Sequence, residues 1–240
     1  MKRAALISLA FVAVLWLVKF IELSGPGDFS WLGVYPQRWE GLIGILTAPL
    51  IHGSFEHLIS NTLPTFLLLT LALFNYPKAT ARAMPLIWIL SGIGIWFIGR
   101  PSWHFGASGI THGLMYFLFV LGLVRQDRNA ITIALAVFFL YGGMLLTVLP
   151  HEQGVSWEAH MSGAFSGALA ALFWRKLDVA TPEPKRSWEL EEEAEADETL
   201  HTFEPPRPDD VPVLWQRPEP ERGVVLRFPA QLRRVPPPEE

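Results

Sequence analysis

Six apolar runs alternate with polar segments over the first 176 residues of the chain. Each is close to the ~20 residues that a helix needs to cross a bilayer. The pattern predicts spans over residues 4–21, 57–74, 83–98, 108–124, 130–149 and 158–174. No small-x-small cleavage site follows the first run closely, so we interpret it as a retained span and not as a signal peptide. We therefore expect an all-α, polytopic membrane protein with a bundle of six transmembrane helices.

Residues 22–56 do not fit either a span or a solvated loop. Gly25, Pro36 and Pro49 interrupt the segment, yet it contains Trp31, Trp39 and several aliphatic residues. Tryptophan is enriched at the level of the lipid headgroups. We expect a loop that lies in the membrane interface.

Charge divides the chain into two parts. Residues 1–176 contain 7 Asp or Glu and 11 Lys or Arg, whereas residues 177–240 contain 16 and 8. The second part is rich in Pro and Glu, a composition typical of disorder, although residues 187–200 suit a short acidic helix. We expect a membrane domain over 1–176 and a disordered tail over 177–240.

Basic residues in the loops predict the orientation. One side of the expected bundle has only Arg38 and Arg100. The other side has eight: Lys2, Arg3, Lys78, Arg82, Arg125, Arg128, Arg175 and Lys176. The positive-inside rule then places both termini and the tail in the cytoplasm. The chain has no cysteine, so disulfides are excluded.

Polar residues gather near the outer ends of three spans. The second span begins with His57 and Asn61, which share a helix face at a spacing of four. The fourth begins with Ser108, and the sixth carries His160 near its start. Polar groups inside a membrane are costly and are functional candidates by default. Their common side and depth predict one shared cavity.

Ser108 has surroundings that suit a nucleophile. It lies in Gly106-Ala107-Ser108-Gly109, where a polar loop meets an apolar run. A backbone N–H in the first turn of a helix has no intrahelical partner and can stabilise an oxyanion. Taken alone, the stretch is more typical of a helix cap with small packing residues. A histidine beside the serine would take its proton as the oxygen attacks.

Small residues predict how Ser108 and His160 meet. The fourth and sixth spans each contain a G-x-x-x-G pair: Gly109 with Gly113, and Gly163 with Gly167. Such pairs let two helix backbones approach closely. No Asp or Glu lies deep in a span, so we expect a Ser-His dyad, with His57, Asn61 and the Ser108 N–H as an oxyanion hole.

Three motifs occur in order on the second, fourth and sixth spans: His52-x4-His57-x3-Asn61, Gly106-Ala107-Ser108-Gly109 and Ala159-His160-x2-Gly163-x3-Gly167. Over about residues 1–176 the chain resembles the rhomboid family of intramembrane serine proteases. The resemblance implies a six-helix fold with a water-filled cavity open to the outer side. It also implies cleavage of other membrane proteins in or near their transmembrane segments, with no metal or cofactor.

Carried over by position, the resemblance makes Ser108 the nucleophile and His160 the general base. His57, Asn61 and the Ser108 amide form the oxyanion hole, and His52 supports the interfacial loop and that hole. The supporting residues are His52, Gly106, Gly109, His112, Gly163 and Gly167. The expected partners are transmembrane substrates and the lipid bilayer, not nucleic acid, and the expected location is a bacterial inner membrane. The physiological substrate and the oligomeric state stay open.

Two features depart from the family pattern. His112 stands where many rhomboids have a tyrosine that stacks on the catalytic histidine. Another imidazole could stack there or form a hydrogen bond, and it could also shift the basicity of His160. Many rhomboids also carry a Trp-Arg pair in the first loop. Here the nearest candidates, Arg38 and Trp39, are reversed and lie further upstream.

Three other functions compete with proteolysis. The first is a non-catalytic rhomboid-like protein that binds membrane clients. The second is a metal site, because six histidines lie on or near the outer half of the expected bundle: His52, His57, His104, His112, His151 and His160. The simpler alternative is that His104 and His151, in the outer loops, are exposed to solvent. The third is a small transporter with Gly-interrupted helices.

Overall fold

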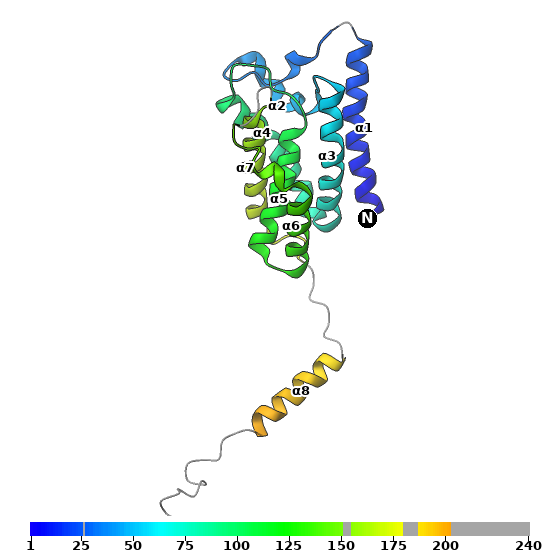
Figure 1. Cartoon of the computed structure of the whole chain (residues 1–240), viewed down its shortest axis with the longest axis vertical. Coiled ribbons are helices and arrows are strands. Elements are labelled where there is room, and N and C mark those ends of the chain that lie inside the picture. The colour runs from blue at the N-terminus through cyan, green and yellow to red at the C-terminus, as the bar shows by residue number, and fades with distance from the viewer. Residues whose placement is uncertain (26, 151–154, 180–186, 203–240) are drawn as a thin grey trace, which may run out of the picture. The chain divides into compact units, whose positions relative to one another are not determined.

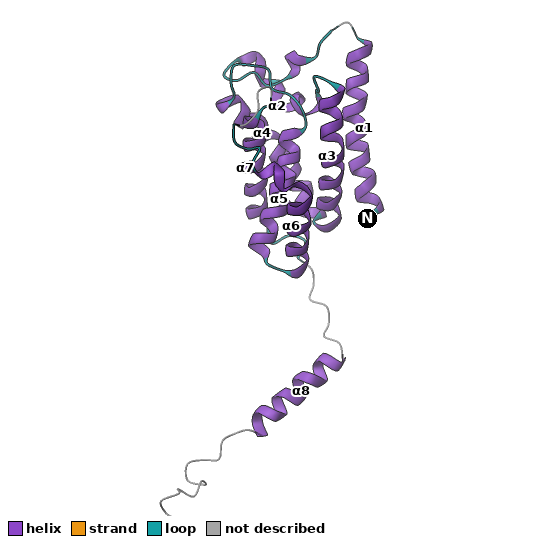
Figure 2. Ribbon diagram, in the orientation of Figure 1, coloured by secondary structure: helices purple, strands orange, loops and turns teal. Residues whose placement is uncertain are grey.

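The computed structural model describes residues 1–25, 27–150, 155–179 and 187–202. The chain divides into two units, Met1–Ala180 and Thr181–Glu240. Every regular element among the described residues is a helix (Figure 2). The all-α class expected from the sequence is therefore confirmed for this part of the chain.

The first unit is a bundle of long helices (Figure 1). They are α1 (Lys2–Ser24), α3 (Phe55–Asn75), α4 (Pro77–Ile98), α5 (Ser108–Arg125), α6 (Arg128–Tyr141) and α7 (Trp157–Trp174). Within the described residues, α1, α3, α4, α5 and the segment Arg128–Leu145 are long and apolar enough to cross a membrane. The chain is thus an integral membrane protein. The expected sixth span forms α7, whose polar and small residues give it a lower mean hydropathy.

Two helix boundaries differ from those expected. Helix α4 begins at Pro77 and not at residue 83, because proline is well suited to the first turn of a helix. The fifth run was expected to continue to Leu149, but α6 ends at Tyr141 and continues only as the 3-10 helix η4 (Gly142–Leu145). Two adjacent glycines are poor helix formers, which accounts for the early end.

Helix α5 occupies the centre of the bundle. It contacts α3, α4, α6 and α7, whereas α1 packs mainly on α3 at the edge (Figure 1). About 61% of the apolar window of α5 is buried, against 22–33% in the other four candidate spans. The helix that begins with Ser108 is therefore the one most shielded by protein.

The described part of the segment between α1 and α3 contains several short helices. It contains η1 (Ser30–Leu32), η2 (Trp39–Leu42), α2 (Gly44–Thr47) and η3 (Ala48–Leu50). Within it, Val34 forms an isolated bridge with His104, and the Ala48 carbonyl accepts a hydrogen bond from the Gly106 N–H at 2.9 Å. These bonds tie the loop to the residues just before Ser108.

Arg125 closes the opposite end of the bundle. Its guanidinium donates to the carbonyls of Leu177 and Asp178 at 3.1 and 3.2 Å. The Asp178 carboxylate accepts from the Ala79 N–H, in the first turn of α4, at 2.8 Å. The chain therefore belongs to the bundle as far as Asp178, two residues beyond the boundary expected from composition.

The second unit contains α8 (Ser187–Thr202). This helix coincides with the acidic segment that the sequence marked as able to form one. Apart from this possible helix, the tail over residues 177–240 was expected to be disordered. For residues 180–186 and 203–240, this expectation of disorder lies outside the described residues.

Candidate active site

A cleft of about 1050 Å³ opens at the end of the bundle where α3, α5 and α7 begin. Its walls include His57, Asn61, Ser108 and His160. These four come from three helices that are far apart in sequence. The structure thus brings the expected nucleophile, base and oxyanion donors to one opening.

Ser108 is the first residue of α5 and lines the cleft, and because of this position its N–H is not used in the helix ladder. The turn before it depends on Gly106, which has a φ of +116°. A Cβ at this position would approach the His57 ring to 2.6 Å. Glycine at 106 therefore allows both the turn and the close approach of His57.

His160 is held by hydrogen bonding and stacking. Its Nδ1 donates to the Thr147 carbonyl oxygen at 3.0 Å, so in the neutral ring Nε2 carries a free lone pair. The His112 ring stacks on it, with centroids 3.8 Å apart and planes 12° apart. The structure contains the stacking that was considered for His112. The described contacts include no hydrogen bond between Ser108 and His160, and such bonds are often long in free enzymes.

The α5–α7 contact has the close approach that the glycine pairs predict. A Cβ on Gly163 would collide with the Gly109 carbonyl, and one on Gly167 with the Gly113 carbonyl. These contacts set the spacing of the helices that carry Ser108 and His160.

His57 and Asn61 lie in the first two turns of α3. The Ser54 hydroxyl caps this helix by accepting from the His57 N–H at 3.1 Å. The Asn61 side-chain amide donates one hydrogen to the His57 carbonyl at 2.9 Å. Its second N–H is left for the cleft that Asn61 lines.

His52 supports the serine turn from the loop before α3. Its Nε2 accepts from the Ala107 N–H at 3.3 Å, and burial lowers the pKa of the imidazole to about 4, which keeps it neutral and able to accept. The Lys19 ammonium donates to the His52 carbonyl and to Glu22, both at 2.8 Å. The bond to the His52 carbonyl connects α1 to the loop beside Ser108, while the ion pair with Glu22 lies within α1.

A polar clasp joins the loop after α4 to the start of α7. Arg100 Nε lies 2.6 Å from a carboxylate oxygen of Glu158, which is fully buried. His104 is also buried, and its Nδ1 lies 2.7 Å from the Ser156 hydroxyl. The idea that His104 is merely solvated is therefore wrong. His151, the other outer-loop histidine interpreted as solvated, lies outside the described residues.

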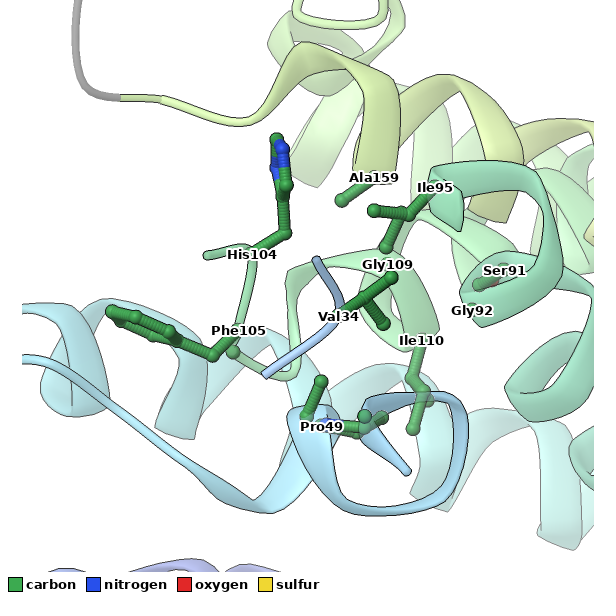
Figure 3. A pocket seen from close by; sticks show the side chains of 13 residues that line it. Val34, Pro49, Ser91, Gly92, Ile95, His104, Phe105, Gly109, Ile110 and Ala159 are labelled. Atoms are coloured by element: carbon green, nitrogen blue, oxygen red, sulfur yellow. The ribbon is translucent and has the colours of Figure 1, made fainter. Parts of the chain in front are cut away.

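A second, much smaller cavity of about 20 Å³ lies behind the serine turn (Figure 3). Val34, Ile95 and Ala159 are among the side chains around it (Figure 3). Its volume is close to the ~10–15 Å³ that one water requires. Of these two cavities in the described part of the chain, the large cleft is the one with room for a peptide segment.

Sequence reasoning missed three groups that hold the site. Thr147 acts through its backbone carbonyl as well as its side chain, and a carbonyl has no sequence signature. Arg100 and Glu158 are 58 residues apart, so their pairing was not visible. Lys19 was visible as a charge inside an apolar run, and that signal could have marked it. Among the described residues, no three His, Asp or Glu are grouped so as to hold a metal ion.

Comparison with known proteins gives a consistent result. A family model described as the rhomboid domain matches residues 38–177. Uncharacterized proteins of Mycobacterium tuberculosis and Mycobacterium bovis are 42% identical to the chain over 176 residues, which cover 68% of this chain and 72% of each relative. An uncharacterized protein of Mycobacterium leprae is 36% identical over 177 residues, or 68% of either chain.

Proposed function

The chain belongs to the rhomboid family, and from this premise we propose that it is a serine endopeptidase that cleaves the transmembrane segments of other membrane proteins. The observation that carries the proposal is the shared cleft of Ser108 and His160, with His160 bound through Nδ1 and its Nε2 free. We further propose that α7 is a sixth span, that both termini are cytoplasmic and that the protein resides in a bacterial inner membrane.

In the proposed mechanism, the Ser108 hydroxyl oxygen attacks the carbonyl carbon of the scissile peptide bond. His160 Nε2 takes the hydroxyl proton as the new C–O bond forms. The carbonyl oxygen becomes an oxyanion, which the Ser108 N–H and the side chains of His57 and Asn61 stabilise. The imidazolium then protonates the leaving nitrogen as the C–N bond breaks.

The second half of the cycle uses the same groups. Water enters the cleft, His160 takes its proton, and the oxygen attacks the acyl carbon. Collapse of this intermediate releases the carboxylate product and returns the proton to Ser108. The Thr147 carbonyl helps here because it stabilises Nδ1–H while the ring is charged.

A non-catalytic rhomboid that binds membrane clients is the competing function. The test is cleavage of a generic transmembrane substrate by the purified full chain in detergent. We expect the wild type to cleave, and Ser108→Ala, His160→Ala and the double variant to be equally inactive, since residues that act as one unit lose function non-additively. Proteolysis by Ser108→Ala would exclude the proposed nucleophile, and an inactive wild type would favour client binding. Activity that a chelator abolishes would favour a metal mechanism.

A further inference from the structure

Thr147 contacts both of the stacked imidazoles. Its carbonyl oxygen lies 3.0 Å from His160 Nδ1, and its hydroxyl oxygen lies 2.8 Å from His112 Nε2. We propose that Thr147 is a positioning residue for the catalytic base, with its hydroxyl acting through His112. The inference rests on the proposed function, in which His160 is that base.

The carbonyl contact determines which nitrogen of His160 can react. A carbonyl oxygen only accepts hydrogen bonds, so Nδ1 carries the hydrogen in the neutral ring. The lone pair is then on Nε2, the nitrogen that must take the serine proton. In hydrolases with a Ser-His-Asp triad a carboxylate holds the histidine in this tautomer. Here a backbone oxygen in the turn after η4 makes the equivalent contact.

The hydroxyl contact determines how the neighbouring ring lies. His112 Nδ1 donates to the Ser108 carbonyl at 2.8 Å, so in the neutral ring Nε2 accepts, and the Thr147 hydroxyl donates to it at 2.8 Å. With both nitrogens bound, the His112 ring cannot rotate without losing a hydrogen bond. Its flat face is therefore held against His160 at a centroid distance of 3.8 Å.

Among the described residues, the Thr147 segment has few other side-chain bonds, such as the one from the Tyr116 hydroxyl to the Leu145 carbonyl at 3.3 Å. Thr147 lies beyond η4, where no helix ladder continues, and the Met144 carbonyl, 2.9 Å from its hydroxyl, competes with His112 Nε2 for the same hydrogen. Its two contacts with the imidazoles join this irregular segment to α5 and α7. Loss of the hydroxyl should thus loosen the contact with His112 and, through it, the orientation of His160.

The test is steady-state cleavage of a transmembrane substrate by the full chain in detergent, with a melting curve for each variant. The variants are Thr147→Val, Thr147→Ser, His112→Phe and the Thr147→Val/His112→Phe double change. The matched control is Thr132→Val. Thr132 is an exposed residue of α6 whose hydroxyl bonds only to its own helix, donating to the Arg128 carbonyl at 2.8 Å.

We expect Thr147→Val to lower kcat about tenfold, the effect of losing one neutral hydrogen bond to the ring that stacks on the base, with KM changed less than about twofold and the melting temperature unchanged. Thr147→Ser should restore kcat, and Thr132→Val should match the wild type. The double variant should be no slower than His112→Phe, because the hydroxyl acts through that ring.

Three results would overturn the inference while leaving the proposed function intact. They are wild-type kcat in Thr147→Val, no recovery in Thr147→Ser, and a loss of kcat that only follows a lower melting temperature. Additive losses in the double variant would exclude the route through His112. An inactive wild type, or an active Ser108→Ala, would remove the proposed function and the inference together.

Discussion

Gly163 of α7 lies against the backbone of Gly109 in α5, so closely that a Cβ at position 163 would collide with the Gly109 carbonyl oxygen. Because helices in lipid are not held together by a hydrophobic force between them, close backbone packing must supply much of the attraction. The same contact sets the separation of Ser108 from His160. Packing and chemistry therefore depend on one pair of glycines.

Enlarging Gly163 should cost stability and activity together. We expect Gly163→Val to lower the melting temperature, since overpacking typically costs about 1–3 kcal/mol. A shift of ~1 Å between the dyad helices can reduce the rate by about 100-fold. Gly143→Ala is the control, because a Cβ there meets nothing within 4 Å. If Gly163→Val melts and cleaves like the wild type, the helices are not in contact at this point.

Asn61→Ala should lower turnover by roughly 10–1000-fold with little change in KM, because the oxyanion exists only in the transition state. The matched control is Asn75→Ala at the far end of α3. Asn75 makes the same type of bond, donating to the Leu71 carbonyl at 2.9 Å, but does not line the cleft. Steady-state kinetics decide the case, and a pure loss of substrate affinity in Asn61→Ala would indicate a structural role.

Replacing Arg100 should lower the stability of the fold more than replacing Glu158, its ion-pair partner. The Glu158 side chain is fully buried, whereas the Arg100 side chain is 48% exposed. Arg100→Met leaves a buried carboxylate without its ion-pair partner, which costs about 3–5 kcal/mol in typical cases. Glu158→Gln leaves an arginine that water can reach and should cost much less. Unfolding of both variants in detergent measures the difference, and equal losses would contradict the burial argument.

The pKa of His52 predicts a pH-dependent stability. Since the folded pKa is lowered from 6.5 to about 4, the unfolded chain binds more protons between these values. Stability should therefore fall as the pH falls from about 6.5 to about 4. His52→Gln removes the titration while keeping an oxygen that can accept from Ala107. Its melting temperature should vary less over this range, and parallel curves for the two proteins would exclude His52 as a source.

The end of the bundle can be located by truncation. Ending the chain after Val179 keeps the bonds of Arg125 and Asp178 and should leave the melting temperature and cleavage essentially unchanged. Ending it after Lys176 removes Leu177 and Asp178 and should lower the melting temperature. Lost activity in the longer truncation would mean that residues beyond Val179 act on the membrane unit.

Apolar periodicity and glycine spacing were enough to predict the bundle and the contact between α5 and α7. Both patterns involve residues that are close together in the sequence, so they are visible without the structure. The end of α6 was misjudged because apolar composition continues past Tyr141, while Gly142 and Gly143 decide the backbone. Hydropathy indicates whether a segment can lie in lipid or in a protein core, but it does not indicate where the backbone hydrogen bonds of a helix end.

Within the candidate site, the sequence predicted only those residues whose side chains are reactive or polar and stand out in an apolar span. Ser108 and His160 are conspicuous because a membrane span contains few such groups. Thr147 is not, since its contact with His160 is made by a carbonyl that every residue has. Glu158 was expected at a loop edge, but its burial depends on Arg100, which approaches it from a distant loop. Contacts between residues that are far apart in the sequence, such as this one, could be identified only from the structure.

The burial of α5 has a consequence for the membrane itself. A bilayer that is thicker or thinner than a helix acts through the lipid-facing surface of that helix, by tilting it or by deforming the lipid around it. Protein buries 61% of the apolar window of α5, against only 22–33% of those of α1, α3, α4 and the segment Arg128–Leu145. Hydrophobic mismatch should therefore be absorbed by the outer helices, and the depth of Ser108 is set by the protein more than by the thickness of the host membrane.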